Sequence, residues 1–156
     1  MSVMAQSRHA LADIEAEDTA VVIVNFKNGA LGVIEATTAT RPKDLEGSLS
    51  ILGSEGTVVI GGFAVNQLTV WEFETPQESD RDVMAQYSVN PPTVYGFGHQ
   101  AYYQHVVSCL TDGVKPLVDG QEGRRSLELI NAIYTSIETK REVLLSEAGS
   151  SRLGHA

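Results

Sequence analysis

Basic residues, cysteine and long apolar runs are all scarce in this chain of 156 residues. Its 11 Lys and Arg stand against 20 Asp and Glu, which gives a formal net charge of −9. Proteins that bind a nucleic-acid backbone or an anionic membrane surface need a positive footprint, and this composition excludes both classes. No apolar run approaches the ~20 residues that are needed to cross a bilayer.

The chain has a single cysteine, Cys109, which can form no internal disulfide. Because Cys109 lies in an apolar helical pattern, we interpret it as a small buried hydrophobe and not as a nucleophile. Residues 1–18 lack the continuous apolar segment of a signal peptide. We therefore expect a cytoplasmic protein in a reducing compartment.

Complete catalytic and cofactor motifs are also missing. His99 and His105 are six residues apart, on different sides of a helix, so they cannot share a metal ion, and we expect no metal site. There is no G-x-S-x-G elbow of a hydrolase. The segment 96–98, Gly-Phe-Gly, resembles the first half of a dinucleotide fingerprint, but the third glycine is missing and the segment follows a loop. Nothing in the sequence is expected to bind NAD by itself.

The sequence does contain a succession of strand patterns followed by two helical patterns. The strand patterns occupy residues 2–8, 19–26, 30–39, 48–53, 57–62 and 66–73, with a last short one at 142–145. Asn28-Gly29 predicts a hairpin with a type I′ turn. The helices are expected at 99–111 and at 121–140, the second capped by Asp119.

These patterns predict an α+β fold, with an open, mainly antiparallel sheet of about six strands and both helices packed on one face. The strand at 19–26 is apolar on both sides, whereas two helices cover only one face of the sheet. A bare apolar face favours association. We therefore expect a homo-oligomer that forms through the open sheet face.

The long acidic connection at 74–98 leads to His99 and Tyr103, which are neighbours on one helix face. One interpretation places this pair beside a substrate pocket, with the amides of the helix N-terminus available to an anion. In the alternative, His99 caps the helix and Tyr103 packs on the sheet. Arg41, in a loop after a strand, is either a ligand for phosphate or carboxylate or a solvated side chain.

Five segments, taken in order, resemble the C-terminal domain of the Gfo/Idh/MocA oxidoreductase family. They are EDTA (17–20), NFKNGALGVIEA (25–36), ILGSEGTVVIGG (51–62), GFGHQAYYQHVV (96–107) and DGQEGRRSLELINAIYTSIET (119–139). The resemblance covers about residues 2–145. Within the family it is greatest to enzymes that oxidise the 3-hydroxyl of UDP-N-acetylglucosaminuronic acid. At Thr139–Arg141 the chain departs from relatives that often have glycine there.

The resemblance implies one part of an NAD(P)-dependent sugar dehydrogenase. The cofactor loop and the catalytic lysine of this family lie in an N-terminal Rossmann domain, and no motif of that domain matches this chain. We therefore expect residues 1–145 to be a single domain for substrate binding and oligomerisation, inactive alone and binding no cofactor alone, with a flexible tail at 146–156.

By analogy with the family, the candidate contacts to a sugar or sugar-nucleotide substrate are Arg41, His99 and Tyr103, and no catalytic residue is assigned. NAD or NADP would serve the full-length enzyme. The alternative function is a non-enzymatic, self-associating binding or assembly module with the same fold.

Overall fold

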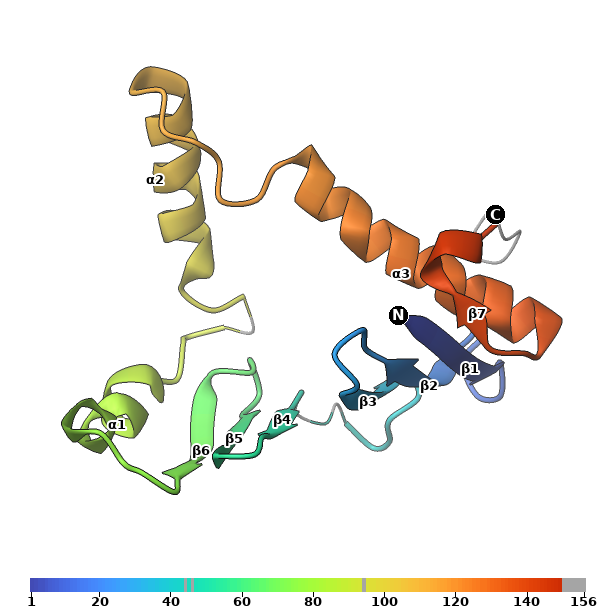
Figure 1. Ribbon diagram of the computed structural model, residues 1–156, viewed down its shortest axis with the longest axis horizontal. Coiled ribbons are helices and arrows are strands. Elements are labelled where there is room, and N and C mark those ends of the chain that lie inside the picture. The colour runs from blue at the N-terminus through green and yellow to red at the C-terminus, as the bar shows by residue number, and fades with distance from the viewer. Residues whose placement is uncertain (44, 46, 94, 150–156) are drawn as a thin grey trace. The chain divides into compact units, whose positions relative to one another are not determined.

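The computed structural model describes residues 1–43, 45, 47–93 and 95–149. The fold is α+β, as expected, and the chain divides into two compact units. Unit 1 consists of Met1–Pro42 and Leu117–Ala156, and unit 2 is the segment Lys43–Pro116 between them. Each unit has its own antiparallel sheet, so the expected strands are divided between two sheets (Figure 1).

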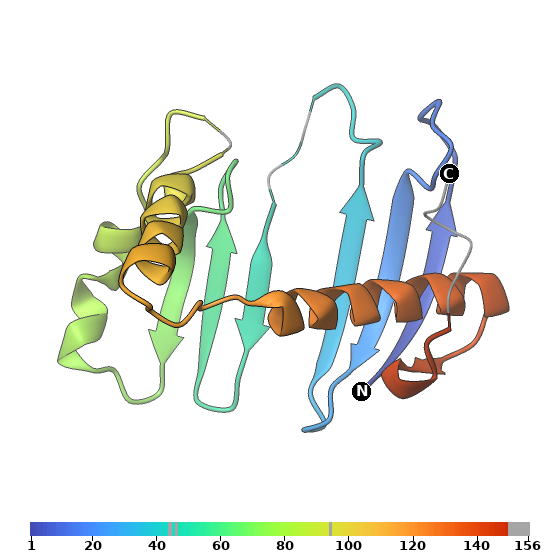
Figure 2. The ribbon, with the colours of Figure 1, turned by 90° about the horizontal axis from the view of Figure 1, so that it is seen from above.

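Unit 1 contains a four-stranded sheet in the order β3-β2-β1-β7, in which every neighbouring pair is antiparallel. The strands are β1 (Ser2–Arg8), β2 (Thr19–Asn25), β3 (Leu31–Thr37) and β7 (Val143–Leu144). Helix α3 (Gly120–Thr139) runs across the strands of this sheet (Figure 2). These elements lie where the sequence patterns predict them.

The core of unit 1 lies between this sheet and α3. The helix contributes the fully buried Ala132. The buried strand residues are Val3, Ala5, Val22, Val24 and Val143. Because side chains alternate along a strand, the residues between them point to the other face. There Val21 and Ile23 are 43% and 44% exposed, and Val33 is 66% exposed. The sheet therefore has one covered face and one open apolar face.

The β2–β3 hairpin forms at the expected place, but its turn differs from the expectation. Gly29 has a φ of +88°, whereas Asn28 keeps a negative φ. The N–H of Gly29 donates to the carbonyl of Phe26 at 3.1 Å, and the N–H of Phe26 donates to the carbonyl of Ala30 at 2.9 Å. This is a three-residue loop with a left-handed glycine. The predicted type I′ turn is wrong, because that turn requires a positive φ at both central residues.

A buried carboxylate fixes the loop between β1 and β2. Asp18 is only 2% exposed. Its Oδ2 accepts hydrogen bonds of 2.9, 2.6 and 2.9 Å from the backbone N–H groups of Ala10, Leu11 and Ala12. These three donors, with Ala12 contributing most, hold the pKa of Asp18 far below its ordinary value because they stabilise the ionised form. The loop is thus fastened to the first residue before β2.

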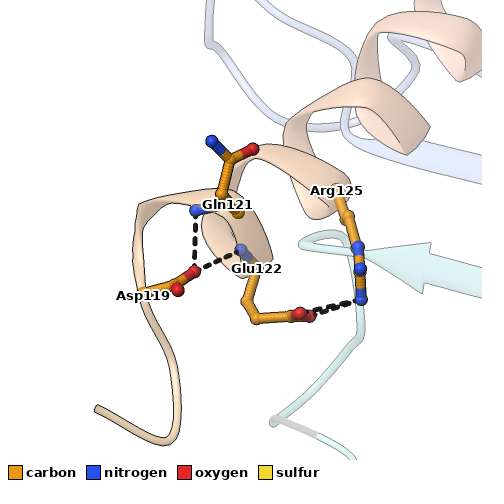
Figure 3. Close-up of polar contacts among 4 residues, drawn as sticks. All are labelled: Asp119, Gln121, Glu122 and Arg125. Atoms are coloured by element: carbon orange, nitrogen blue, oxygen red, sulfur yellow. Dashed lines mark hydrogen bonds and ion pairs between the residues drawn. The ribbon is translucent and has the colours of Figure 1, made fainter. Parts of the chain in front are cut away.

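The N-terminus of α3 is capped as the sequence predicts. Oδ1 of Asp119 accepts hydrogen bonds from the N–H groups of Gln121 and Glu122 at 2.9 and 3.1 Å (Figure 3). The Glu122 carboxylate pairs with Arg125 at 2.8 Å, in the same turn. At the other end the helix stops at Lys140, which adopts the left-handed conformation with a φ of 56°.

A buried hydroxyl joins α3 to the edge of β1. The Oγ atom of Ser136 accepts a 3.0 Å hydrogen bond from the N–H of Ala5 and donates a 2.7 Å bond to the carbonyl of Arg141. Two residues earlier, the Tyr134 hydroxyl donates to Glu17 at 2.9 Å, and this bond raises the pKa of Tyr134. The helix is therefore held to the sheet by specific polar contacts as well as by apolar packing.

Unit 2 contains a three-stranded antiparallel sheet in the order β4-β5-β6. The strands are β4 (Leu49–Leu52), β5 (Gly56–Gly61) and β6 (Gln67–Phe73). In the β4–β5 turn, the N–H of Gly53 donates to the carbonyl of Gly56 at 2.8 Å. A Cβ at Gly56 would stand only 2.5 Å from the backbone oxygen of Glu72, so a side chain here would clash with β6.

The connection at 74–98 contains two short helices that the sequence did not predict, η1 (Glu78–Arg81) and α1 (Val83–Tyr87). Trp71 on β6 donates its Nε1–H to Asp80 at 3.0 Å. Farther along the same strand, the N–H of Leu68 donates to Ser88 Oγ, also at 3.0 Å. The connection therefore packs along the outer strand of the sheet and protects its edge.

Helix α2 (Gly98–Thr111) ends before Gly113, whose φ of +68° fits the glycine that was expected to stop it. Unlike α3, it contributes no buried side chain within its unit.

None of the helices in the described part of the chain combines the length and apolar character that crossing a bilayer requires. The last element among the described residues is η2 (Leu145–Glu147). Of the expected flexible tail, residues 150–156 lie outside the described residues.

Candidate substrate-binding residues

His99 and Tyr103 lie one turn apart in the first half of α2. The Phe97 side chain at the N-cap position makes no capping hydrogen bond. The His99 ring packs against Tyr95, with 6.0 Å between ring centroids and 78° between planes. The Tyr103 ring packs against Tyr102 at 5.4 Å and 64°. Both predicted residues thus belong to edge-to-face aromatic pairs on the surface of unit 2.

Tyr103 is 62% exposed and borders an open hollow along one side of α2. Gln100, Gln104, Val107 and Ser108 complete its lining. A shallow, mainly apolar surface of this kind can supply one flat ring together with amide and phenol hydrogen bonds. Such a surface can bind and orient a ligand.

Arg41 lies after β3, in unit 1. Its side chain is exposed, and Nη1 donates a 2.8 Å hydrogen bond to the backbone carbonyl of Thr40. Four of the five N–H donors of a guanidinium stay available after one such bond. The three predicted residues are therefore divided. His99 and Tyr103 share one helix, and Arg41 belongs to the other unit.

The aromatic neighbour that the sequence reasoning missed is Tyr95. It precedes α2, and Gly96 with its φ of +66° turns the chain between Tyr95 and the helix. Tyr95 and His99 are four residues apart, but this spacing predicts that two side chains are neighbours only when both lie in one helix. Tyr95 lies outside α2. Only the left-handed turn at Gly96 brings its ring to His99.

Cys109 is half-buried, and its sulfur lies 3.5 Å from Nε2 of His105. The two residues are one helical turn apart on α2. Within the described residues, no group of three or more His, Cys, Asp or Glu side chains is placed to hold a metal ion.

Comparison with known proteins places this chain among oxidoreductases. Residues 2–145 match the family model described as "Oxidoreductase family, C-terminal alpha/beta domain". Two similar solved structures are WlbA dehydrogenases in complex with NADH and UDP-GlcNAcA. The enzyme from Bordetella pertussis is 42% identical with a TM-score of 0.84, and the alignment covers 91% of this chain and 41% of that one. For the enzyme from Chromobacterium violaceum the values are 42%, 0.81, 91% and 39%.

A curated relative, myo-inositol 2-dehydrogenase from Thermotoga maritima, is 30% identical over 130 residues. That match covers 83% of this chain and 37% of the relative. The chain thus spans about two fifths of the length of the proteins that it resembles. The family and subgroup resemblances found in the sequence are both confirmed. The chain belongs to the Gfo/Idh/MocA oxidoreductase family and corresponds to the C-terminal α/β domain of its members.

Proposed function

We propose that this chain is the substrate-binding and self-associating part of an NAD(P)-dependent dehydrogenase that acts on a UDP-linked sugar uronate. The observation that carries the proposal is the 42% identity, over 91% of the chain, to WlbA dehydrogenases that were solved with NADH and UDP-GlcNAcA. The chain has no complete dinucleotide fingerprint of its own, so we propose that it is inactive and binds no cofactor by itself.

In this proposal the chain binds and orients the substrate. The guanidinium of Arg41 is suited to a carboxylate or a diphosphate, because its planar N–H donors match paired oxygens. The His99 imidazole and the Tyr103 hydroxyl are hydrogen-bonding groups at an exposed surface. When bound elsewhere in the longer enzyme, NAD(P) would take the hydride from the sugar carbon.

Self-association is proposed to use the open face of the four-stranded sheet. Met4, Ile23 and Val33 stand in register across β1, β2 and β3 on this face. They are 38%, 44% and 66% exposed, whereas α3 covers the opposite face. A second copy that covers this row would remove a continuous apolar surface from water, which stabilises the assembly.

Complementation tests the assignment as a whole. The purified chain is titrated with NADH and with UDP-GlcNAcA, and dehydrogenase activity is then assayed after a Rossmann-type partner domain is added. We expect no turnover by the chain alone and turnover in the mixture. NADH binding by the isolated chain would contradict the proposal. Self-association without turnover in any mixture would favour the non-enzymatic assembly module instead.

The residue assignment has its own test. In the complemented enzyme, Arg41→Ala and His99→Ala are each expected to raise the KM for UDP-GlcNAcA about tenfold, because a hydrogen bond to a charged group is lost. Arg124→Ala is the matched control, since Arg124 is an exposed arginine paired with Glu128 on α3. An unchanged KM in both site variants would show that these residues do not contact the substrate.

A further inference from the structure

Exposed aromatic rings are concentrated around the start of α2. Three of the five tyrosines, Tyr95, Tyr102 and Tyr103, lie between positions 95 and 103, together with Phe97. Tyr95 is 74% exposed, Phe97 61%, Tyr102 60% and Tyr103 62%. Leaving this much aromatic surface in water is unfavourable. The concentration therefore indicates that something covers these rings when the protein works.

The rings form two edge-to-face pairs, and we define their four members, Tyr95, His99, Tyr102 and Tyr103, as the aromatic array. The Tyr95 ring meets that of His99, and the Tyr102 ring meets that of Tyr103, both edge to face. Within α2, His99 and Tyr103 are neighbours by their four-residue spacing. In an edge-to-face pair one ring contributes only its edge, so its flat faces stay free to stack on another ring.

The composition of α2 indicates what kind of partner the array fits. Its first half, from Gly98 to His105, is polar and aromatic, with Ala101 as the one aliphatic residue. The aliphatic residues Val106, Val107 and Leu110 all come later. A protein partner would favour a mixed aliphatic and aromatic surface. Val107 borders the hollow beside Tyr103, but flat rings with hydroxyl and imidazole tips predominate at the start of the helix. Such rings suit a planar ligand such as a nucleobase.

We propose that the aromatic array stacks the pyrimidine base of a uridine nucleotide. The inference deepens the proposed function, because it rests on a UDP-linked substrate and says which part of that substrate α2 receives. It also adds Tyr95 and Tyr102 to the predicted contacts. The base lies against the flat faces of the rings, and stacking supplies most of the affinity.

The experiment measures binding of UMP and of ribose 5-phosphate to the full chain by saturation-transfer NMR. We expect the uracil H5 and H6 protons to receive the strongest saturation, and ribose 5-phosphate, which lacks the base, to bind at least tenfold more weakly. Tyr95→Leu and Tyr103→Leu should each weaken UMP binding about tenfold, as the loss of one stacked ring does. Tyr103→Phe keeps the ring and should stay within about twofold of the wild type.

The matched control is Tyr87→Leu, at a tyrosine on α1 that is also 62% exposed but lies outside the array. It should leave UMP binding unchanged. Because all these rings are largely exposed, the substitutions do not disturb a core. Equal binding of UMP and ribose 5-phosphate, no binding of UMP, or full UMP binding by both leucine variants would each overturn the inference.

Two further results would overturn it in favour of another occupant. If glucuronic acid, added as a third probe, receives saturation while UMP receives none, the array belongs to the sugar and the proposed function stands. Self-association that Tyr95→Leu abolishes would assign the array to a second copy of the chain. Failure of the proposed function is a separate outcome, because it shows as absent turnover on complementation while UMP still binds.

Discussion

At the scale of single residues, Asp18 shows how a short acidic side chain can organise a loop. Its carboxylate binds three successive backbone N–H groups and is almost fully buried. The hydrogen bonds lower the pKa in the folded state relative to the unfolded state. A lowered folded-state pKa contributes stability that is complete above the ordinary carboxyl range and is lost as the pH falls.

We therefore predict that Asp18→Asn lowers the Tm clearly at neutral pH, because the neutral amide accepts these bonds more weakly and its NH₂ group adds unwanted donors. The gap to the wild type should narrow as the pH is lowered from about 5 to about 2, where the carboxylate loses its advantage. Thermal unfolding followed by circular dichroism across this range measures it. A gap that stays constant with pH would contradict the proposed origin.

Lys140 is the second residue with a consequence for stability. It ends α3 in the left-handed conformation, where Cβ is crowded against the backbone, and glycine is the residue that usually occupies this position. Relatives of the resembled family often have glycine at 139–141, and the left-handed backbone at Lys140 gives a physical reason for that glycine. Lys140→Gly is expected to raise the free energy of unfolding by about 1 kcal/mol. Lys140→Ala, which keeps the Cβ, should give no such gain in urea denaturation.

At the scale of secondary-structure elements, the attachment of α3 to β1 depends on Ser136. We expect Ser136→Ala to lower the free energy of unfolding by about 1–3 kcal/mol, because the N–H of Ala5 would be left buried without its acceptor. Ser126→Ala, at an exposed position of the same helix, is the control and should change stability little. Equal effects of the two substitutions would show that the Ser136 bridge contributes nothing specific.

How far the sequence predicts these elements depends on how local their causes are. The Asp119 cap and the strand patterns are local, and the structure has them in place. The turn at Asn28-Gly29 was predicted as the wrong type because the same dipeptide fits two loop lengths. Helix α1 was missed because its five residues lie in an acidic, proline-containing segment, and its attachment depends on contacts to β6.

The candidate site was less predictable than the elements. The spacing of His99 and Tyr103 predicts one helix face, and they share it. The contact between Tyr95 and His99 depends on a left-handed turn at Gly96. The burial of the Asp18 carboxylate depends on three backbone amides that lie six to eight residues earlier. Neither geometry has a signature in residue spacing.

At the scale of the whole molecule, the open sheet face predicts a change in mass. Val33→Glu places a carboxylate at the most exposed point of the Met4–Ile23–Val33 row. If this face joins two copies, sedimentation at micromolar concentration should show an oligomer for the wild type and a monomer for the variant, because burying an unpaired charge is costly. Leu110→Glu, at an exposed position in the C-terminal half of α2, is the control and should leave the mass unchanged. A monomeric wild type would refute association through this face.

The way unit 2 interrupts unit 1 also sets an order for biosynthesis. The N-terminal strand β1 pairs with β7, and the N–H of Leu145 donates to the carbonyl of Met1. Strands β1 to β3 therefore leave the ribosome long before the helix that covers them, whereas all of unit 2 is made in one stretch. During that interval the apolar surface destined for α3 has no cover. A nascent chain stalled before residue 117 should be a better chaperone substrate than the finished protein.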